Sequence, residues 1–297
     1  FFALRETTLN AFAMPGGFIG VHSGLVLAAQ SESELAGVLA HEISHVTQRH
    51  IARSVGKQGQ AQMTQLAALA LAILAARSNP QVAEAAVIGT AAASIQTQLN
   101  YSRDFEREAD RIGIQTLDRA GFDVRGMGSF FDRLQKFGRL YENNAPGYLR
   151  THPLTTERIS DMENRIRQAQ YRQVANSTEF LLVRAKLRAT QGSPAEAVAD
   201  FTAQLRERKH LSAPAAHYGL AVAQMRARDF AAAERGLGEL RRLGTASPMV
   251  ESLAAELRRA RGDLGAAERL YREGRARYPQ ARALLYGQID TLLADGR

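Results

Sequence analysis

Residues 41–45, with the sequence HEISH, contain two histidines and a glutamate whose types and spacing suit a metal-dependent hydrolytic site. Side chains four residues apart project from one face of a helix, so His41 and His45 can bind a single Zn²⁺. Glu42 lies roughly 100° around that helix from His41, where its carboxylate can reach a metal-bound water as general base. The motif alone is weak evidence, because roughly one chain of this length in a hundred contains it by chance.

A catalytic zinc ion takes three protein ligands besides water, so a third ligand must come from elsewhere in the chain. A third histidine of the metzincin type would stand at position 51 with glycine at 48, but the chain has Ile51 and Gln48. His50 would lie nearly opposite His41 on a continuous helix, which predicts a solvated or packing side chain. The HEISH helix therefore does not supply the third ligand.

The better candidate lies in residues 102–113, with the sequence SRDFEREADRIG. Glu106 and Asp110 are four residues apart and share one face of a second helix, from which Glu108 points away. Glu106 can therefore bind zinc, while Asp110 accepts the other ring N–H of a ligating histidine and fixes its tautomer. This pair is the expected second half of the site.

The elements that must position these residues begin with short segments of β type. Runs at residues 10–14, 17–22 and 25–27, separated by turn residues, predict a small antiparallel sheet. Ser31 followed by Glu34 is a capping-box pattern, after which apolar residues recur at helical spacing. We expect a helix from this cap to about residue 55, carrying the HEISH segment.

An apolar run of 14 residues at 63–76 is followed by the Ala-rich stretch 82–95. The run is too short to span a bilayer, which needs about 20 residues in a helix. A buried core helix is the first interpretation, and a helix that faces a membrane surface or a partner is the second. The sequence leaves both open.

Repeats appear in residues 176–297. The segments 195–201, 231–237 and 265–271 align at offsets of 36 and then 34 residues, which is the period of tetratricopeptide repeats. Stacked helix pairs of this kind bury Ala and Gly against Leu, Phe and Tyr and leave a concave face for a protein ligand. We predict a solenoid over 176–297, in preference to a helical bundle without a binding role, and a separate domain over 1–172.

Composition limits the remaining possibilities. A chain of 297 residues favours two domains, and the absence of cysteine excludes a disulfide framework and a thiol nucleophile. A net charge of +8 favours contact with anionic lipid or acidic proteins. The arginines are interspersed with acidic residues and no nucleic-acid motif appears, so we expect no nucleic-acid partner. From the opening at Phe1, without Met or a signal segment, we expect a processed or trimmed product with residues missing before it.

The combination of HExxH with Glu-x-x-Ala-Asp resembles the M48 peptidases. Residues 10–17 (NAFAMPGG), 41–50 (HEISHVTQRH) and 101–104 (YSRD) are similar to M48 members of the Gram-negative envelope that carry C-terminal tetratricopeptide repeats, and the likeness covers nearly the whole chain. The resemblance implies a mainly α fold, with a gluzincin-type M48 peptidase domain that contains a small β-sheet, followed by an α-solenoid of tetratricopeptide repeats.

The resemblance also implies roles. His41, His45 and Glu106 would be zinc ligands, with Glu42 as general base and Asp110 as the carboxylate that orients a ligand. The protein would be a periplasmic zinc metalloendopeptidase with a chaperone-like role in envelope quality control. Its partners would be misfolded or assembling outer-membrane β-barrel proteins and the β-barrel assembly machinery. By the same likeness the peptidase domain is N-terminally truncated, and residues 63–95 stand where the family has membrane-proximal helices.

His152, followed by Pro153, is a further candidate. A lone loop histidine is ordinarily solvated, but a His-Pro element approaches the zinc in the family that the chain resembles. An imidazole in the fourth position would displace the water that catalysis needs, so the site would inhibit itself. The alternative is a transition-state donor. Arg158, six residues on, could likewise face the cleft, but a position on a helix surface is the expectation.

Two other classes of function remain open. One is a protein-binding chaperone module whose zinc site is largely silent, against which the intact Glu42 argues. The other is a different zinc hydrolase. A peptidase with a client-binding repeat domain is the leading interpretation.

Overall fold

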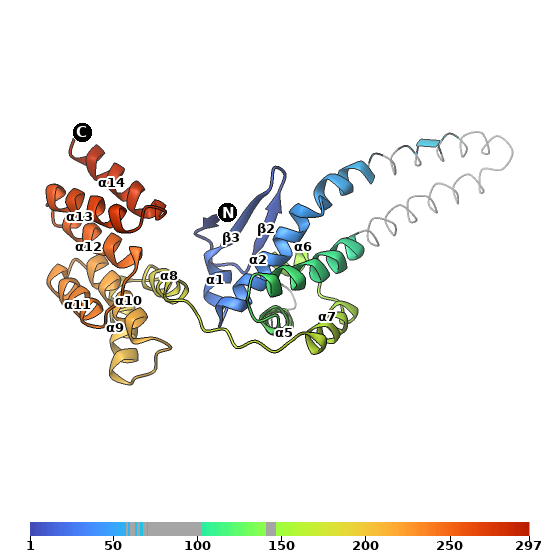
Figure 1. The fold of residues 1–297 in the computed structure, drawn as a ribbon, viewed down its shortest axis with the longest axis horizontal. Coiled ribbons are helices and arrows are strands. Elements are labelled where there is room, and N and C mark those ends of the chain that lie inside the picture. Colours follow the sequence, from blue (N-terminus) through green and yellow to red (C-terminus); the bar gives the residue numbers. More distant parts are fainter. Residues whose placement is uncertain are drawn as a thin grey trace. The chain divides into compact units, whose positions relative to one another are not determined.

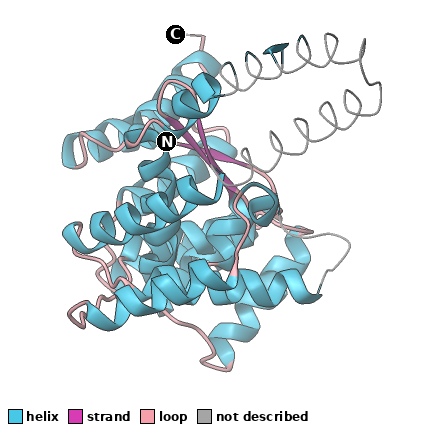
Figure 2. Cartoon of the chain, turned by 90° about the vertical axis from the view of Figure 1, so that its right-hand side faces the viewer, coloured by secondary structure: helices cyan, strands magenta, loops and turns pink. Residues whose placement is uncertain are grey.

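The structure is a computed structural model that describes residues 1–57, 102–140 and 147–296, with a few isolated positions between 59 and 70. It divides into two compact units, Phe1–Ala175 and Asn176–Arg297, and helices dominate (Figures 1 and 2). The mainly helical fold class is confirmed. The predicted helices within 63–95 lie almost entirely outside the described residues. Among the described helices, none has the length and apolar character needed to cross a membrane.

A three-stranded sheet opens the first unit (Figure 1). Its strand order is β1-β3-β2. β2 (Ala11–Met14) and β3 (Phe18–His22) form the expected antiparallel hairpin. β1 (Phe2–Leu4) pairs with β3 in parallel and was not predicted. The expectation of a purely antiparallel sheet is therefore wrong, because a strand of three residues carries too little pattern to be recognised.

The strand expected at residues 25–27 is also wrong, because these residues lie in helix α1 (Ser23–Ala28). Leu25 and Val26 are buried there. A short apolar run has no period that distinguishes a buried strand from one buried helical turn, so only the tertiary environment decided between them.

Helix α2 (Glu32–Thr47) carries the HEISH segment and contacts β2. Its N-cap is the predicted one, since the Glu34 N–H donates to Ser31 Oγ at 3.1 Å. The helix ends earlier than expected because Arg49 has φ 55°, a left-handed conformation that interrupts α-helix. A separate helical segment follows at residues 50–57.

Glycines let two helical segments approach α2 closely. Helix α5 (Arg125–Leu140) contacts α2, and a Cβ on its Gly126 would lie only 2.5 Å from a backbone carbonyl carbon of that helix. In the helical segment 102–119, a Cβ on Gly113 would lie 3.3 Å from His41 Cα. These close contacts bring the side chains of segment 102–119 up to the HEISH face of α2.

Two further helices lie among the described residues of the first unit, α6 (Gly147–Thr151) and α7 (Thr156–Gln168). The Tyr148 N–H donates to Leu9 O at 3.1 Å, which ties α6 to the segment before β2. α7 contacts α5. The core of the first unit draws on several helices, with Val38, Phe105, Leu117, Phe130, Phe131, Leu134 and Met162 among the buried side chains.

The second unit is a succession of helices joined by short turns. In chain order these are α8 (Thr178–Ala189), α9 (Pro194–Arg206), α10 (Ala213–Arg226), α11 (Phe230–Arg242), α12 (Pro248–Ala260), α13 (Leu264–Arg277) and α14 (Arg282–Ala294). The three aligned segments fall in α9, α11 and α13. Phe201 packs directly on Gly219, and Tyr271 packs on Gly287, where added Cβ atoms would lie 2.2 and 2.4 Å from the rings. This packing of large on small residues is consistent with a repeat solenoid.

Candidate active site

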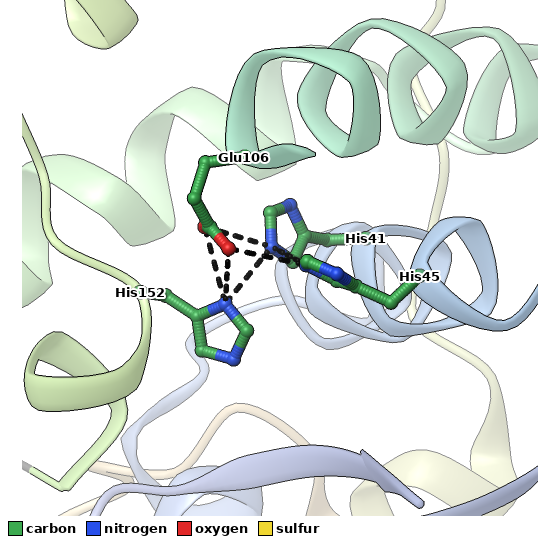
Figure 3. A group of neighbouring side chains, drawn as sticks. All are labelled: His41, His45, Glu106 and His152. Atoms are coloured by element: carbon green, nitrogen blue, oxygen red, sulfur yellow. Dashed lines mark hydrogen bonds and ion pairs between the residues drawn. The ribbon is translucent and has the colours of Figure 1, made fainter. Parts of the chain in front are cut away.

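Four side chains from three parts of the first unit converge (Figure 3). His41 and His45 come from α2, Glu106 from the helical segment 102–119, and His152 from the residue after α6. One possible ligand atom from each lies within 4.8 Å of the others. His41 is fully buried, and Glu106 and His152 are buried too. The structure thus brings together residues that are far apart in the sequence.

The spacing of the donor atoms suits a tetrahedrally bound cation. His41 Nε2 lies 3.0 Å from His45 Nε2 and 3.4 Å from Glu106 Oε2, and His45 Nε2 lies 3.3 Å from Glu106 Oε1. Ligand atoms about 2.0–2.2 Å from a common zinc ion are roughly 3.3–3.6 Å apart in tetrahedral geometry. Two imidazole nitrogens and a carboxylate are also a donor set typical of catalytic zinc.

Glu42 lies beside this donor set. Its carboxylate is fully buried, and neither oxygen has a hydrogen-bond partner among the described residues. A buried carboxylate without hydrogen bonds is costly, so this position suits a polar group such as a metal-bound water next to the donor set. The residues present therefore fit a divalent metal.

Asp110 lies behind His41, on the side away from the donor set. Its Oδ1 is 2.9 Å from His41 Nδ1, the ring nitrogen that carries the proton when Nε2 directs its lone pair at a metal. Burial would raise the pKa of Asp110, but its contacts with His41 and Arg158 lower it, so the carboxylate is ionised. This is the position that an orienting carboxylate requires, and the role itself stays a prediction.

The surface position expected for Arg158 is wrong, and the structure agrees with the alternative of a side chain that faces the site. Its side chain is buried rather than on a helix surface, and it donates to both oxygens of Asp110, from Nε at 2.7 Å and from Nη2 at 2.8 Å. Its Nη1 lies 3.0 Å from Glu106 Oε2 and donates to Pro153 O at 2.7 Å. The sequence could not show this, because tertiary packing decides which face of α7 turns inward.

The electrostatics of the metal-free site follow from burial and close charges. Burial lowers the pKa of His41, but contacts with Asp110 and Glu106 outweigh it and raise that pKa to about 10. Burial prevails at His45 and lowers its pKa to about 4. Burial would raise the pKa of Glu106, but hydrogen bonds with three histidines hold it well below the usual value. Glu106 is thus ionised and His45 neutral, as metal ligands must be.

His152 lies at the fourth corner of the cluster. Its Nδ1 is 3.3 Å from His41 Nε2 and 3.1 Å from each oxygen of Glu106 (Figure 3). Its Nε2 is 3.5 Å from Glu42 Oε1. The ring stacks on Tyr148, with centroids 4.6 Å apart. The His-Pro element therefore approaches the donor set, as predicted for it.

Tyr148 is a residue that the sequence analysis missed. It is fully buried, and its hydroxyl has no hydrogen-bond partner among the described residues. Burial, followed by the negative charge of Glu42, raises its pKa well above the usual value, so the phenol keeps its proton. Its position four residues before His152 was the available signal, since that spacing places both rings on one helical face.

His50 is a packing histidine, one of the two possibilities expected. It is 3% exposed, and its ring stacks on Phe105 at 4.6 Å between centroids. Its Nδ1 lies 3.0 Å from His45 Nδ1, and its Nε2 lies 3.1 Å from Glu108 Oε2. Glu108 points away from the donor set, as predicted, and meets His50 instead.

The fold and this arrangement define a class of protein, the metallopeptidases that carry HExxH on one helix and an acidic ligand on a second. The family model described as peptidase family M48 matches residues 1–166. The chain therefore belongs to peptidase family M48, which is metal-dependent.

Proteins similar to this chain carry related names. The "Putative beta-barrel assembly-enhancing protease" of Vibrio cholerae serotype O1 is 45% identical over 244 residues, 81% of this chain and 50% of that protein. The "Beta-barrel assembly-enhancing protease" of Escherichia coli K12 is 38% identical over 242 residues, 81% of this chain and 49% of that protein. The "Mitochondrial metalloendopeptidase OMA1" of Arabidopsis thaliana is 34% identical over 151 residues, 50% of this chain and 28% of that protein. The chain spans about half the length of the bacterial relatives.

Proposed function

We propose that this chain is a zinc-dependent endopeptidase of the periplasm that acts on unfolded or stalled outer-membrane β-barrel proteins. The zinc chemistry rests on one observation, a donor set of two histidines and Glu106 whose atoms lie 3.0–3.4 Å apart. Beside it lies the carboxylate of Glu42, which has no hydrogen-bond partner among the described residues. The link to β-barrel assembly rests on the names of the bacterial relatives. The compartment and the clients rest on the resemblance to M48 members of the Gram-negative envelope.

In this proposal His41, His45 and Glu106 would hold the zinc ion, which would supply Lewis-acid chemistry for activating a water and polarising the scissile carbonyl. Glu42 accepts the proton of the attacking water and passes it to the leaving amine. Asp110 holds the ring of His41 with Nε2 toward the donor set. The two ion-paired contacts from Arg158 keep Asp110 in place for that task.

His152 holds the resting enzyme closed. Its Nδ1 stands at the fourth corner of the donor set, where the catalytic water must bind. Substrate access then requires His152 to move away. In the alternative, His152 donates a hydrogen bond to the transition state. The distance of 3.5 Å between its Nε2 and Glu42 Oε1 supports this second role. The two roles predict opposite effects of removing the imidazole.

In this proposal the two units have separate roles. Residues 1–172 form the peptidase domain, and residues 176–297 form a tetratricopeptide-repeat domain that binds the client. Large-on-small helix packing in the second unit supports the repeat assignment. Its chaperone-like role follows if the repeats bind an unfolded client without cleaving it.

The test is zinc content together with cleavage of a defined client. The full chain is expected to contain one zinc ion and to cleave an unfolded outer-membrane β-barrel protein faster than a folded soluble protein of similar size. A chelator should abolish cleavage, and added zinc should restore it. A protein without bound zinc would contradict the metal assignment. Zinc without peptidase activity, but with tight client binding, would favour the chaperone alternative.

A further inference from the structure

A chain of polar side chains runs from His45 to the protein surface, and the mechanism above does not use it. His45 turns Nε2 to the donor set and Nδ1 the opposite way, 3.0 Å from Nδ1 of His50. The other nitrogen of His50 lies 3.1 Å from Glu108 Oε2. The same oxygen accepts a hydrogen bond from Arg53 Nη1 at 2.7 Å. The order of the side chains along this chain of contacts is thus His45, His50, Glu108 and Arg53.

The chemistry at the two ends fixes the direction of these hydrogen bonds. A metal-facing Nε2 needs its lone pair free, so the single ring proton of neutral His45 is on Nδ1. His50 Nδ1 must then accept that proton's hydrogen bond, which places the proton of His50 on Nε2. Nε2 faces the Glu108 carboxylate, which can only accept. The hydrogen bond from Arg53 Nη1 to the same oxygen is the contact that an ionised carboxylate accepts.

His41 has the same kind of support in a shorter form. Asp110 lies directly behind it, with Oδ1 2.9 Å from His41 Nδ1. Glu108 and Asp110 both belong to the helical segment 102–119. Each ligand histidine is therefore backed by a carboxylate of that segment, His41 directly and His45 through an intervening imidazole.

The backbone is built to make this arrangement possible. On a continuous helix, His50 would lie about 140° around the axis from His45 and could not reach its ring. The left-handed conformation of Arg49, with φ 55°, ends α2 and lets His50 face back toward His45. The stack on Phe105, with ring planes 17° apart, then fixes the imidazole in a buried position.

We propose that His50 and Glu108 are positioning residues of the metal site, which together hold the His45 ring with Nε2 toward the ion. The proposal rests on the proposed function, in that His45 is a metal ligand. Groups that orient metal-binding histidines typically contribute about 10–100-fold to metal affinity. Loss of the acceptor on His50 should therefore weaken metal binding by roughly that factor.

The test compares substitutions that separate hydrogen bonding from packing. His50→Phe keeps an aromatic ring to stack on Phe105 but removes both nitrogens, so His45 Nδ1–H loses its acceptor. His50→Asn loses the ring but places a carbonyl oxygen near the former Nδ1, where it can accept. We expect zinc affinity, measured in the full chain by competition with a chromophoric chelator, to fall about 10–100-fold in His50→Phe and to recover largely in His50→Asn. The visible spectrum of bound Co²⁺ should change in His50→Phe.

The matched control is His22→Phe, which removes another hydrogen-bonded histidine of the same unit, whose Nδ1 lies 2.7 Å from Thr8 Oγ1. It should leave zinc affinity unchanged, and the unfolding temperature of each metal-free variant shows whether the fold persists. Zinc binding by His50→Phe within about twofold of wild type, or no recovery in His50→Asn, overturns the proposal. A wild-type chain that binds no zinc overturns the proposed function as well, so the two failures are distinguishable.

Discussion

Glu42 differs from the other carboxylates of the site, because neither of its buried oxygens has a hydrogen-bond partner among the described residues. Replacement by Gln keeps the shape of the side chain but removes the basic group. We expect Glu42→Gln to lower kcat/KM for peptide cleavage by at least about 10²–10⁴-fold, the usual contribution of a general base, with zinc still bound. Steady-state kinetics and metal analysis on one preparation measure both. Cleavage at the wild-type rate would remove Glu42 from the mechanism.

The two roles proposed for His152 predict opposite effects of removing its imidazole. If its imidazole occupies the position of the catalytic water, His152→Ala should raise peptide cleavage, by roughly tenfold or more where the closed form dominates. Because Nδ1 lies within 3.3 Å of His41 Nε2, the same variant should also bind zinc less tightly. Initial rates at saturating zinc separate the two effects. An unchanged rate would argue against the latch, and a lower rate would favour the transition-state role.

The raised pKa of His41 links metal binding to pH. In the metal-free protein a pKa of about 10 keeps His41 protonated at neutral pH, so its proton must leave when a metal binds at Nε2. We expect about one proton to be released per zinc at pH 7, and zinc affinity to rise with pH up to about 10. Calorimetry in buffers of different ionisation enthalpy counts the protons. Binding without proton release would contradict the charged His41.

The raised pKa of His41 has the opposite effect on the stability of the metal-free protein, which falls as the pH rises. A pKa raised on folding stabilises the metal-free protein below the unfolded-state value of about 6.5. That contribution is lost as the pH rises toward about 10, the pKa in the folded state. Metal-free protein should therefore become less stable with rising pH in this window, while zinc binds more tightly.

Among the helices, the contact between α2 and α5 depends on the absence of a Cβ atom at Gly126. A Cβ on Gly126 would lie 2.5 Å from the carbonyl carbon of Ser33, so Gly126→Ala must push the two helices apart. We expect a loss of about 1–3 kcal/mol in unfolding free energy, as for other overpacked contacts. Gly56→Ala is the control, since its Cβ would meet nothing within 4 Å and should be neutral or slightly stabilising. Equal effects in denaturant titrations would contradict the close approach.

For the whole molecule, the separation into two compact units makes a prediction about division of labour. Each unit has its own buried core, so residues 1–175 are expected to fold without the second unit. This fragment should bind zinc as tightly as the full chain but bind an unfolded β-barrel protein at least about tenfold more weakly, because the proposed client surface is gone. Fluorescence anisotropy with a labelled client measures this. Equal client binding by the fragment would place recognition in the peptidase unit.

The sequence by itself determined the chemistry available to this protein. The four-residue spacings of His41 with His45 and of Glu106 with Asp110 predict shared helical faces, because that geometry is local. The Ser31 cap of α2 and the repeat period of the second unit were predictable for the same reason. Short elements were not, since the strand β1 and helix α1 span too few residues to show a period.

Only the tertiary structure decided how these groups meet. Contacts between distant segments decide which face of α7 turns inward, and so bury Arg158. Such contacts also decide the helix break that turns His50 toward His45. The approach of His152 to Glu106, at 3.1 Å, depends on them too. The physical reason is that hydrogen bonds within a helix fix only the relative positions of side chains on that same helix. The rotation, ending and separation of helices are set instead by packing, which here depends on side chains as small as Gly113.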